Sequence, residues 1–150
     1  MRIVAQRVSS ADVKIDGELA GSTGYGLCLL VGVAPGDTER EVSWVADKIV
    51  NLRIFDDESG RMNRSLLDVG GSMLIISQFT LYADCRKGRR PSFISAAAPL
   101  HGNAMYELLV QYVRERGVAV QTGIFGADMS VRIINEGPVT IILDTDDISK

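Results

Sequence analysis

The stretch from 26 to 50, GLCLLVGVAPGDTEREVSWVADKIV, decides the fold. It begins with a continuous apolar run of strand length at 26–33, which is typical of a strand covered on both faces. Pro35-Gly36 ends this run, and Thr38 followed by Glu41 predicts the capping box of a helix. Apolar residues then recur at helical spacing along one face. The stretch therefore predicts a buried strand followed by an amphipathic helix.

The rest of the chain contains further strands and one more helix. Residues 2–8 and 13–15 are rich in strand formers and lead into Asp16-Gly17, a strong hairpin signal. This element order predicts one mixed α/β domain over 1–150, with both helices on one side of the sheet. The elements expected after the first helix are a short strand at 53–55, a turn at 56–61, a buried strand at 72–82, a helix at 99–116 and strands at 118–121, 129–135 and 138–144.

The charge of the chain limits how it could bind nucleic acid. It has 150 residues, of which 16 are basic and 19 acidic, and a formal net charge of -3. A protein that coats nucleic acid has a basic surplus, which this chain lacks. Any contact with RNA must therefore come from a local basic cluster.

The cysteines and the single histidine do not form a metal site. Cys28 lies in an apolar run and is expected to be a small buried hydrophobe, and Cys85 is far from it in sequence. With His101 alone they make no zinc-binding cluster, so we expect neither metal nor cofactor. No apolar run approaches the roughly 20 residues of a membrane span. We expect a reduced cytoplasmic protein without a membrane partner.

The segment Ser77-Gln78-Phe79-Thr80-Leu81 is the first candidate for chemistry, because a buried apolar strand becomes polar there. Strand alternation would put Ser77 and Phe79 on one face and Gln78 and Thr80 on the other. One interpretation is a strand that emerges into solvent with its hydroxyls bonded locally. The other is a strand end whose side chains and free N–H groups face a substrate.

The segment 135–140, NEGPVT, is the second candidate. Its simplest interpretation is a tight turn between two strands. The alternative is functional: Gly137 and Pro138 expose rigid carbonyls that sheet pairing does not consume, and such carbonyls can hold a substrate ammonium group.

A cluster of four cations, directly after the first candidate segment, is the third candidate: Arg86, Lys87, Arg89 and Arg90. It is either a solvated loop or a contact for RNA phosphates. His101 is expected in the first turn of the second helix, where a surface or capping role is the better interpretation. The sequence thus contains no recognisable triad, paired-carboxylate site or metal site.

These segments together resemble the D-aminoacyl-tRNA deacylase family. SQFTL at 77–81 and NxGPVT at 135–140 match the two signatures of the family, and the likeness includes NLRIFDDESGRMNRSLLDVGG at 51–71 and TGIFGADM at 122–129. It extends over almost the whole chain. The resemblance implies a three-layer α/β domain with a barrel-like mixed sheet, a homodimer with active sites at its interface, and aminoacylated tRNA as the substrate.

The resemblance also implies roles for individual residues. Ser77, Gln78, Phe79 and Thr80 would form the catalytic wall. The substrate-binding residues would be Gly137 and Pro138, joined by a cis peptide as a chiral gate from the other subunit, together with Asn135 of the same signature, a supporting Arg7, and Phe125 and Met129 around the adenine.

Two mechanisms remain open, and we favour the first: hydrolysis assisted by the RNA 2′-hydroxyl and backbone N–H groups, or attack by Thr80. A gate that excludes L side chains would not exclude glycine, so glycyl-tRNA is an expected second substrate. The competing interpretations are a nucleic-acid-binding module without catalysis and an esterase for small molecules.

Overall fold

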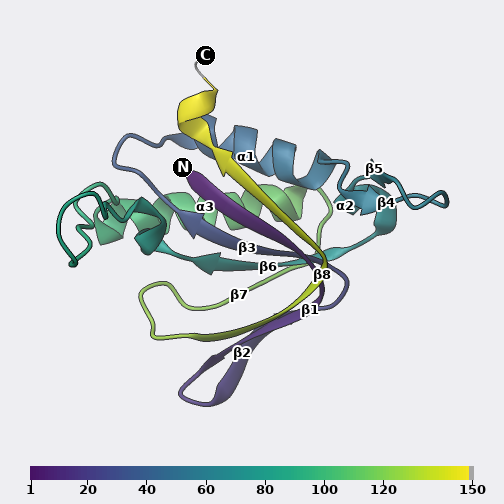
Figure 1. Cartoon of the computed structure of the whole chain (residues 1–150), viewed down its shortest axis with the longest axis horizontal. Coiled ribbons are helices and arrows are strands. Elements are labelled where there is room, and N and C mark those ends of the chain that lie inside the picture. The colour runs from purple at the N-terminus through teal and green to yellow at the C-terminus, as the bar shows by residue number, and fades with distance from the viewer. Residues whose placement is uncertain (149–150) are drawn as a thin grey trace.

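The structure is a computed structural model that describes residues 1–148. Figure 1 shows α1 and α3 lying together beside the long strands of the sheet. The strands are β1 Arg2–Ile15, β2 Glu18–Thr23, β3 Gly26–Gly32, β4 Phe55–Asp56, β5 Met62–Arg64, β6 Ser72–Ser77, β7 Val120–Thr122 and β8 Ser130–Asp144. The helices are α1 Glu39–Asn51, α2 Leu66–Val69 and α3 Pro99–Glu115, with 3-10 turns η1 Phe79–Tyr82 and η2 Thr145–Asp147.

The predicted helix starts and stops are confirmed. The Thr38 side chain accepts a hydrogen bond at the start of α1 while the Glu41 carboxylate accepts one from Thr38 N at 2.8 Å, so the capping box is complete. Helix α3 starts at Pro99 and is followed by Gly117, whose φ of 87° suits a residue without a side chain. The Asp16-Gly17 hairpin joins β1 to β2 as expected.

The main sheet is strongly curved and nearly closed. Its strand order is β2-β1-β3-β6-β7, with β3, β6 and β7 parallel to one another and β1 antiparallel to its neighbours. The two end strands, β2 and β7, lie close together, as a hydrogen bond between them shows: Ser22 N in β2 donates to Gln121 Oε1 in β7 at 2.8 Å. Gly21 permits this approach, since a Cβ there would lie 2.5 Å from the Thr122 carbonyl oxygen. The expected barrel-like mixed sheet is therefore confirmed.

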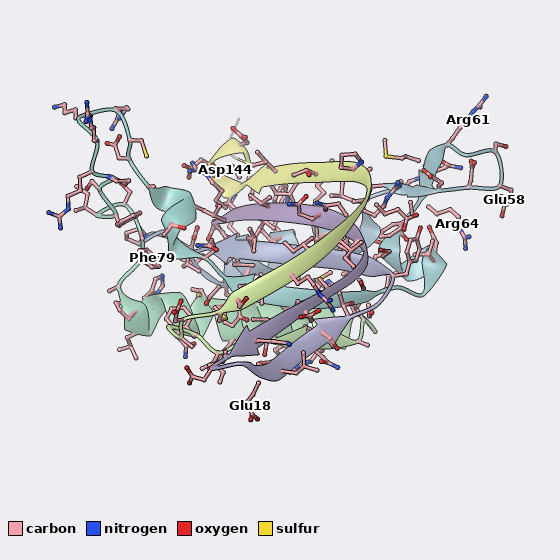
Figure 2. All side chains as sticks on the ribbon, turned by 60° about the horizontal axis from the view of Figure 1, so that its bottom comes forward. Glu18, Glu58, Arg61, Arg64, Phe79 and Asp144 are labelled. Carbon is pink, nitrogen blue, oxygen red and sulfur yellow. The ribbon has the colours of Figure 1, made fainter. Side chains whose placement is uncertain are left out.

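Strand β8 lies along β1 for most of the length of both strands. It pairs antiparallel with residues 2–14 of β1, and Figure 2 shows it crossing the sheet as a long yellow arrow. On its other side β1 pairs first with β3 and then with β2. The chain thus brings its first and last long strands together.

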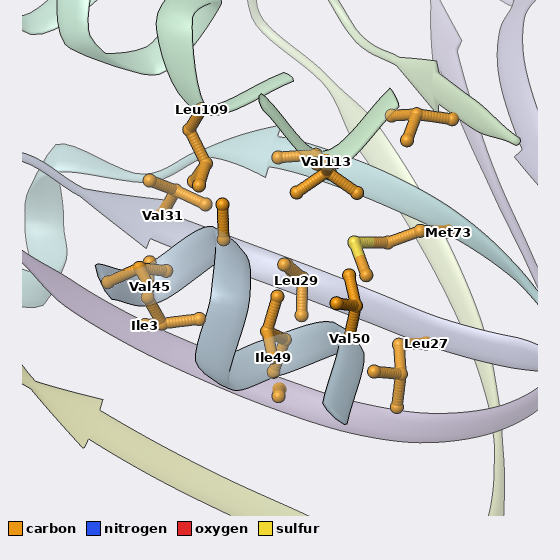
Figure 3. Close-up of a cluster of buried hydrophobic side chains, with 14 of the residues drawn as sticks. Ile3, Leu27, Leu29, Val31, Val45, Ile49, Val50, Met73, Leu109 and Val113 are labelled. Atoms are coloured by element: carbon orange, nitrogen blue, oxygen red, sulfur yellow. The ribbon is translucent and has the colours of Figure 1, made fainter. Parts of the chain in front are cut away.

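Two apolar clusters give the fold its layers. The larger lies between the helices and the sheet, where Val45 and Ile49 of α1 and Leu109 of α3 pack on Ile3 and Leu29 (Figure 3). The second fills the inside of the curved sheet and consists of Val8, Ala11, Val13, Cys28, Leu74 and Ile76. Helices, sheet and the folded-over strands form the three expected layers, with both main helices on one side.

The region between α1 and β6 differs in detail from the expectation. The expected strand at 53–55 is instead β4, which pairs with β5 across the turn at 57–61. Helix α2 was not expected, because its single turn is too short for an apolar period to be visible in the sequence. Ser65 and Asp68 hold it with a capping box. Within residues 1–148 no helix is long and apolar enough to cross a membrane.

Candidate active site

A pocket of about 270 Å³ opens at the carboxyl ends of β3 and β6. Ligands commonly bind beside the carboxyl ends of parallel strands. The walls are mostly apolar and include residues from three other parts of the chain: the start of α3, the segment before it, and the loop between β7 and β8. The lining residues are Val31, Val33, Ile76, Ser77, Gln78, Phe79, Ala97, Gly102, Tyr106, Phe125, Gly126, Ala127, Asp128, Met129 and Val131.

The predicted strand at 72–82 is wrong in its second half. β6 ends at Ser77, and the chain turns at Gln78 into the 3-10 turn η1. Gln78 N still donates to the Val31 carbonyl at 2.7 Å, but Leu81 N bonds back to the Gln78 carbonyl at 3.2 Å. The expected alternation of Ser77 and Phe79 against Gln78 and Thr80 therefore does not occur. The sequence around Ser77 could not reveal where β6 ends, because β6 stops where its pairing with β3 stops, at the pair of Ser77 with Val31.

This turn leaves two backbone donors free beside the pocket. The N–H groups of Phe79 and Thr80 start η1 and make no hydrogen bond within the described part of the chain, residues 1–148. The Thr80 hydroxyl oxygen accepts a hydrogen bond from Gln78 Nε2 at 2.5 Å. The end of β6 is thus followed by two unpaired N–H groups and by the Thr80 hydroxyl, which is hydrogen-bonded to the side-chain amide of Gln78.

Two glycines shape the opposite wall of the pocket. A Cβ on Gly102 would lie 3.3 Å from Phe125 Cζ, and one on Gly123 would lie 2.4 Å from Met129 Sδ. Both glycines therefore leave room for Phe125 and Met129, which line the pocket. Sequence analysis did not find Gly102; a glycine inside a helix costs about 1 kcal/mol and is a signal for close packing.

The second candidate segment is not a turn between two strands. The expected strands 129–135 and 138–144 form the single strand β8. Gln6 pairs with Thr140 and Val8 with Asn135, so β8 has surplus residues here that bulge away from β1. The peptide bond between Gly137 and Pro138 is cis, as the resemblance implies, and both residues are exposed.

Arg7 supports this bulge from inside the protein. It is only 5% exposed. Its Nε donates to the Glu136 carbonyl at 3.2 Å, and its Nη1 donates to the Ile54 carbonyl at 2.8 Å. Nη1 also lies 3.3 Å from Asp56 Oδ1, which compensates the buried charge. Arg7 therefore fixes the position of the residue immediately before Gly137.

The bulge and the pocket lie at opposite ends of the sheet within one subunit. Val8, which faces Asn135, pairs with Gly26, and Gly26 pairs with Ser72 at the start of β6. Ser77, at the pocket, is at the other end of β6. At about 3.3 Å per residue, the strand separates the two levels by about 16 Å. The structure thus groups Ser77, Gln78 and Phe79 with Phe125 and Met129, but not with Asn135, Gly137 and Pro138.

The basic cluster lies on a projecting loop. Asp84 and Ser92 close the loop with two backbone hydrogen bonds of 2.8 and 3.0 Å. Arg86 hydrogen-bonds to Asp84, with an ion-pair distance of 2.7 Å, and thereby lowers the pKa of that carboxyl to about 2. Lys87, Arg89 and Arg90 are exposed, and in the described chain they form no ion pair. Three of the four predicted cations are thus available to a ligand.

The remaining candidates lie outside the pocket. His101 lies in the first turn of α3, as predicted, and its Nε2 is 2.9 Å from the Asp37 carbonyl oxygen. The start of α3 has no side-chain cap, so the alternative of a capping role is wrong, and His101 instead links α3 to the segment before α1. Cys28 is buried as expected, and its burial raises the pKa of its thiol to about 12. Among residues 1–148 no group of three His, Cys, Asp or Glu side chains is arranged to hold a metal ion.

Comparison with solved structures supports the fold. The chain superposes on a structure named c-Myc DNA Unwinding Element Binding Protein with a TM-score of 0.91 and 38% identity, covering 97% of this chain and 99% of the other. A probable eukaryotic D-amino acid tRNA deacylase gives a TM-score of 0.84 over 95% of this chain and 97% of that chain. Its 19% identity supports the fold alone.

Comparison with sequences identifies the family. A protein from Brevibacillus brevis named D-aminoacyl-tRNA deacylase is 56% identical over 97% of this chain and 100% of its own length. One of the same name from Thermomicrobium roseum is 57% identical over 97% of this chain and 94% of its own length. Residues 4–144 match the family described as D-Tyr-tRNA(Tyr) deacylase. This protein therefore belongs to the D-Tyr-tRNA(Tyr) deacylase family.

Proposed function

We propose that this protein hydrolyses the ester bond between a D-amino acid and tRNA, releasing the free amino acid and the tRNA. The observation that carries this proposal is the pocket at the end of β6, where the free N–H groups of Phe79 and Thr80 lie beside a mostly apolar cavity of about 270 Å³. This volume is near the lower end of ligand pockets, roughly 300 Å³, and suits one nucleoside rather than a larger part of tRNA. The names of the relatives point to the same reaction.

The chemistry requires little from side chains. An aminoacyl ester is already reactive, so stabilising the oxyanion of the tetrahedral intermediate supplies much of what the reaction needs. An oriented N–H donor contributes about 2.7–4 kcal/mol to such an intermediate in proteases. In our proposal the N–H groups of Phe79 and Thr80 are these donors, Phe125 and Met129 hold the adenine, and the RNA 2′-hydroxyl activates the water.

The chiral gate requires a second copy of the chain. Gly137 and Pro138 are exposed and lie at the far end of the sheet from the pocket of their own subunit. In a symmetric dimer the same surface of each copy meets the other, so the gate of one copy could reach the pocket of its partner. We therefore propose a homodimer with two shared sites, in the cytoplasm, where tRNA is charged.

Selectivity in this arrangement comes from exclusion. One methylene changes binding by only ~1–3 kcal/mol, so an affinity difference would separate amino acids poorly. A rigid gate that clashes with every L side chain rejects them all. Glycine has no side chain to clash, and we propose glycyl-tRNA as a second substrate.

A mixed dimer tests whether the gate acts across subunits. Ala97→Trp fills the pocket and Gly137→Ala distorts the gate, so each homodimer should be inactive. In a heterodimer purified through two different affinity tags, one site combines the intact pocket and the intact gate, and about half of the normal activity should return. Homodimers purified in the same way are the controls. An inactive heterodimer would mean that the gate serves its own subunit, and sedimentation of an active monomer would remove the dimer.

Replacing Arg89 and Arg90 by Ala tests the basic loop. Each phosphate contact contributes about 0.9 to the slope of log affinity against log salt, so the double variant should bind tRNA more weakly and with a slope smaller by up to about 2. Filter binding of tRNA over a salt series measures this. Arg86→Ala is the matched control, because Arg86 is already paired with Asp84. An unchanged slope would make the cluster a solvated loop.

A nucleic-acid-binding role without catalysis is the second candidate, favoured by the name of the 38% identical structure. Incubation with D-tyrosyl-tRNA and L-tyrosyl-tRNA separates the two: we expect release of D-tyrosine only. A protein that binds tRNA but releases neither amino acid would support the second candidate. Hydrolysis of simple D-amino-acid esters without RNA would indicate a small-molecule esterase instead.

A further inference from the structure

An exposed pair of aromatic rings lies at the rim of the pocket. Phe79 is 57% exposed and Phe93 is 39% exposed, although both are large apolar side chains. Their ring centroids are 5.2 Å apart and the rings are inclined at 75°, an edge-to-face pair. Phe79 also lines the pocket. An apolar surface left open beside a binding site is typical of a contact for a ligand or partner.

The backbone holds both rings in place. Phe79 begins η1, directly after the end of β6. Phe93 follows Ser92, which is bonded to Asp84, and its own carbonyl accepts from Ala96 N at 3.1 Å. Ala97 N in turn donates to the Val33 carbonyl at 2.9 Å. These bonds fix the backbone positions from which the two rings project.

The rings lie between the pocket and the basic loop. Ser92 closes that loop and Phe93 is its immediate neighbour, so the free cations Lys87, Arg89 and Arg90 start a few residues away. Figure 2 shows Phe79 where the chain leaves the body of the protein for this projecting loop, whose outer end carries nitrogen atoms. Pocket, aromatic pair and cations thus follow one another along the surface.

We propose that Phe79 and Phe93 form a stacking platform for an unpaired base of an RNA strand, namely the nucleotide next to the one in the pocket. The inference rests on the proposed function, which puts the terminal nucleoside of tRNA in the pocket. Proteins that bind single strands combine aromatic rings, on which bases stack, with cations that follow the phosphates. The excess of cations here, in a chain of net charge -3, is complementary to a phosphate backbone. The platform selects an acceptor end whose last bases are unpaired.

Fluorescence of a modified RNA tests the platform directly. The probe is an uncharged RNA hairpin with a single-stranded 3′ end, carrying 2-aminopurine at the nucleotide next to the terminal adenosine. Stacking on an aromatic ring changes 2-aminopurine fluorescence, so the unmodified protein should quench it on titration. Phe93→Ala should lose the quenching and Phe93→Trp should retain it. The control is Ile94→Ala, which alters an adjacent side chain that is 88% exposed. Equal quenching by Phe93→Ala would overturn the proposal.

Kinetics with two substrates separates this proposal from the proposed function. A stacked base contributes ~1–3 kcal/mol, so Phe93→Ala should reduce kcat/KM on D-tyrosyl-tRNA by about tenfold or more. D-tyrosyl-adenosine has no second nucleotide, and its cleavage should fall far less. Equal losses on both substrates would mean that Phe93 only supports Phe79, and would overturn the platform. If the unmodified protein cleaves neither substrate, the proposed function fails, and the fluorescence titration alone decides the platform.

Discussion

A D-aminoacyl-tRNA whose terminal adenosine lacks the 2′-hydroxyl should be almost resistant to this protein, whereas Thr80→Ala should lose only about tenfold in kcat, or about 1.4 kcal/mol. The expected loss for Thr80→Ala is small because of the surroundings of Thr80. Its hydroxyl oxygen accepts a hydrogen bond from the Gln78 amide, which cannot remove a proton. His101, the one histidine, is bonded to the Asp37 carbonyl instead. Single-turnover hydrolysis of D-aminoacyl-tRNA with and without the terminal 2′-hydroxyl, by the unmodified protein and by Thr80→Ala, measures these effects.

Thr80→Ser is the matched control, because it keeps the hydroxyl and the backbone N–H group. The two mechanisms then differ clearly. If Thr80 is the nucleophile, Thr80→Ala should lose several orders of magnitude while Thr80→Ser stays active, and mass spectrometry should find an aminoacyl group on Thr80. If the RNA and the backbone carry out the reaction, both variants remain active and no adduct forms. We expect the second result.

Gly137→Ala should reduce deacylation by about 100-fold or more, since a shift of about 1 Å in a positioning group can have such an effect. Gly137 has a φ of 123°, which L side chains rarely adopt. A Cβ there would lie 2.9 Å from Val139 N and 3.3 Å from Arg7 Nη2. The bulge, which forms the proposed gate, must therefore move. Rates on D-tyrosyl-tRNA and L-tyrosyl-tRNA measure both activity and discrimination.

Gly36→Ala provides the matched control for this substitution. A Cβ on Gly36 would meet no atom within 4 Å, so this variant should keep its activity. Sedimentation should give the same oligomeric state for both variants, which separates a displaced gate from a lost partner. Full activity of Gly137→Ala would remove the gate from the mechanism.

Much of the fold could be predicted because local signals set it. The capping box at Thr38, the apolar run at 26–33 and the stop at Gly117 depend on residues close in sequence, and the structure confirms each. The errors at 77–82 and 135–140 have a different origin. Both depend on which strand lies alongside, β3 in the first case and β1 in the second. A sequence pattern shows the period of a strand but not where its partner ends or where surplus residues bulge.

The candidate site could be predicted only in part. The two signatures were visible because polar residues and Gly-Pro are conspicuous in apolar strands. The walls contributed by Gly102, Tyr106 and Ala97 were not, since nothing local distinguishes a pocket-lining residue of a helix from a packed one. The separation of the two signatures within one subunit could not be predicted either, because it becomes visible only from the register of the paired strands. The proposal of a dimer rests on that separation.

The pairing of β1 with β8 also affects how the protein is made. On a ribosome β1 emerges before the other strands of the sheet and can pair early with β2 and β3, but its other edge stays open until residues 130–144 have been synthesised. An unpaired strand edge is a template for association with other chains. Contacts between such distant segments also slow folding. The open edge of β1 should therefore need protection from association with other chains until translation is almost complete. A bound chaperone or a low local concentration of other nascent chains would provide it.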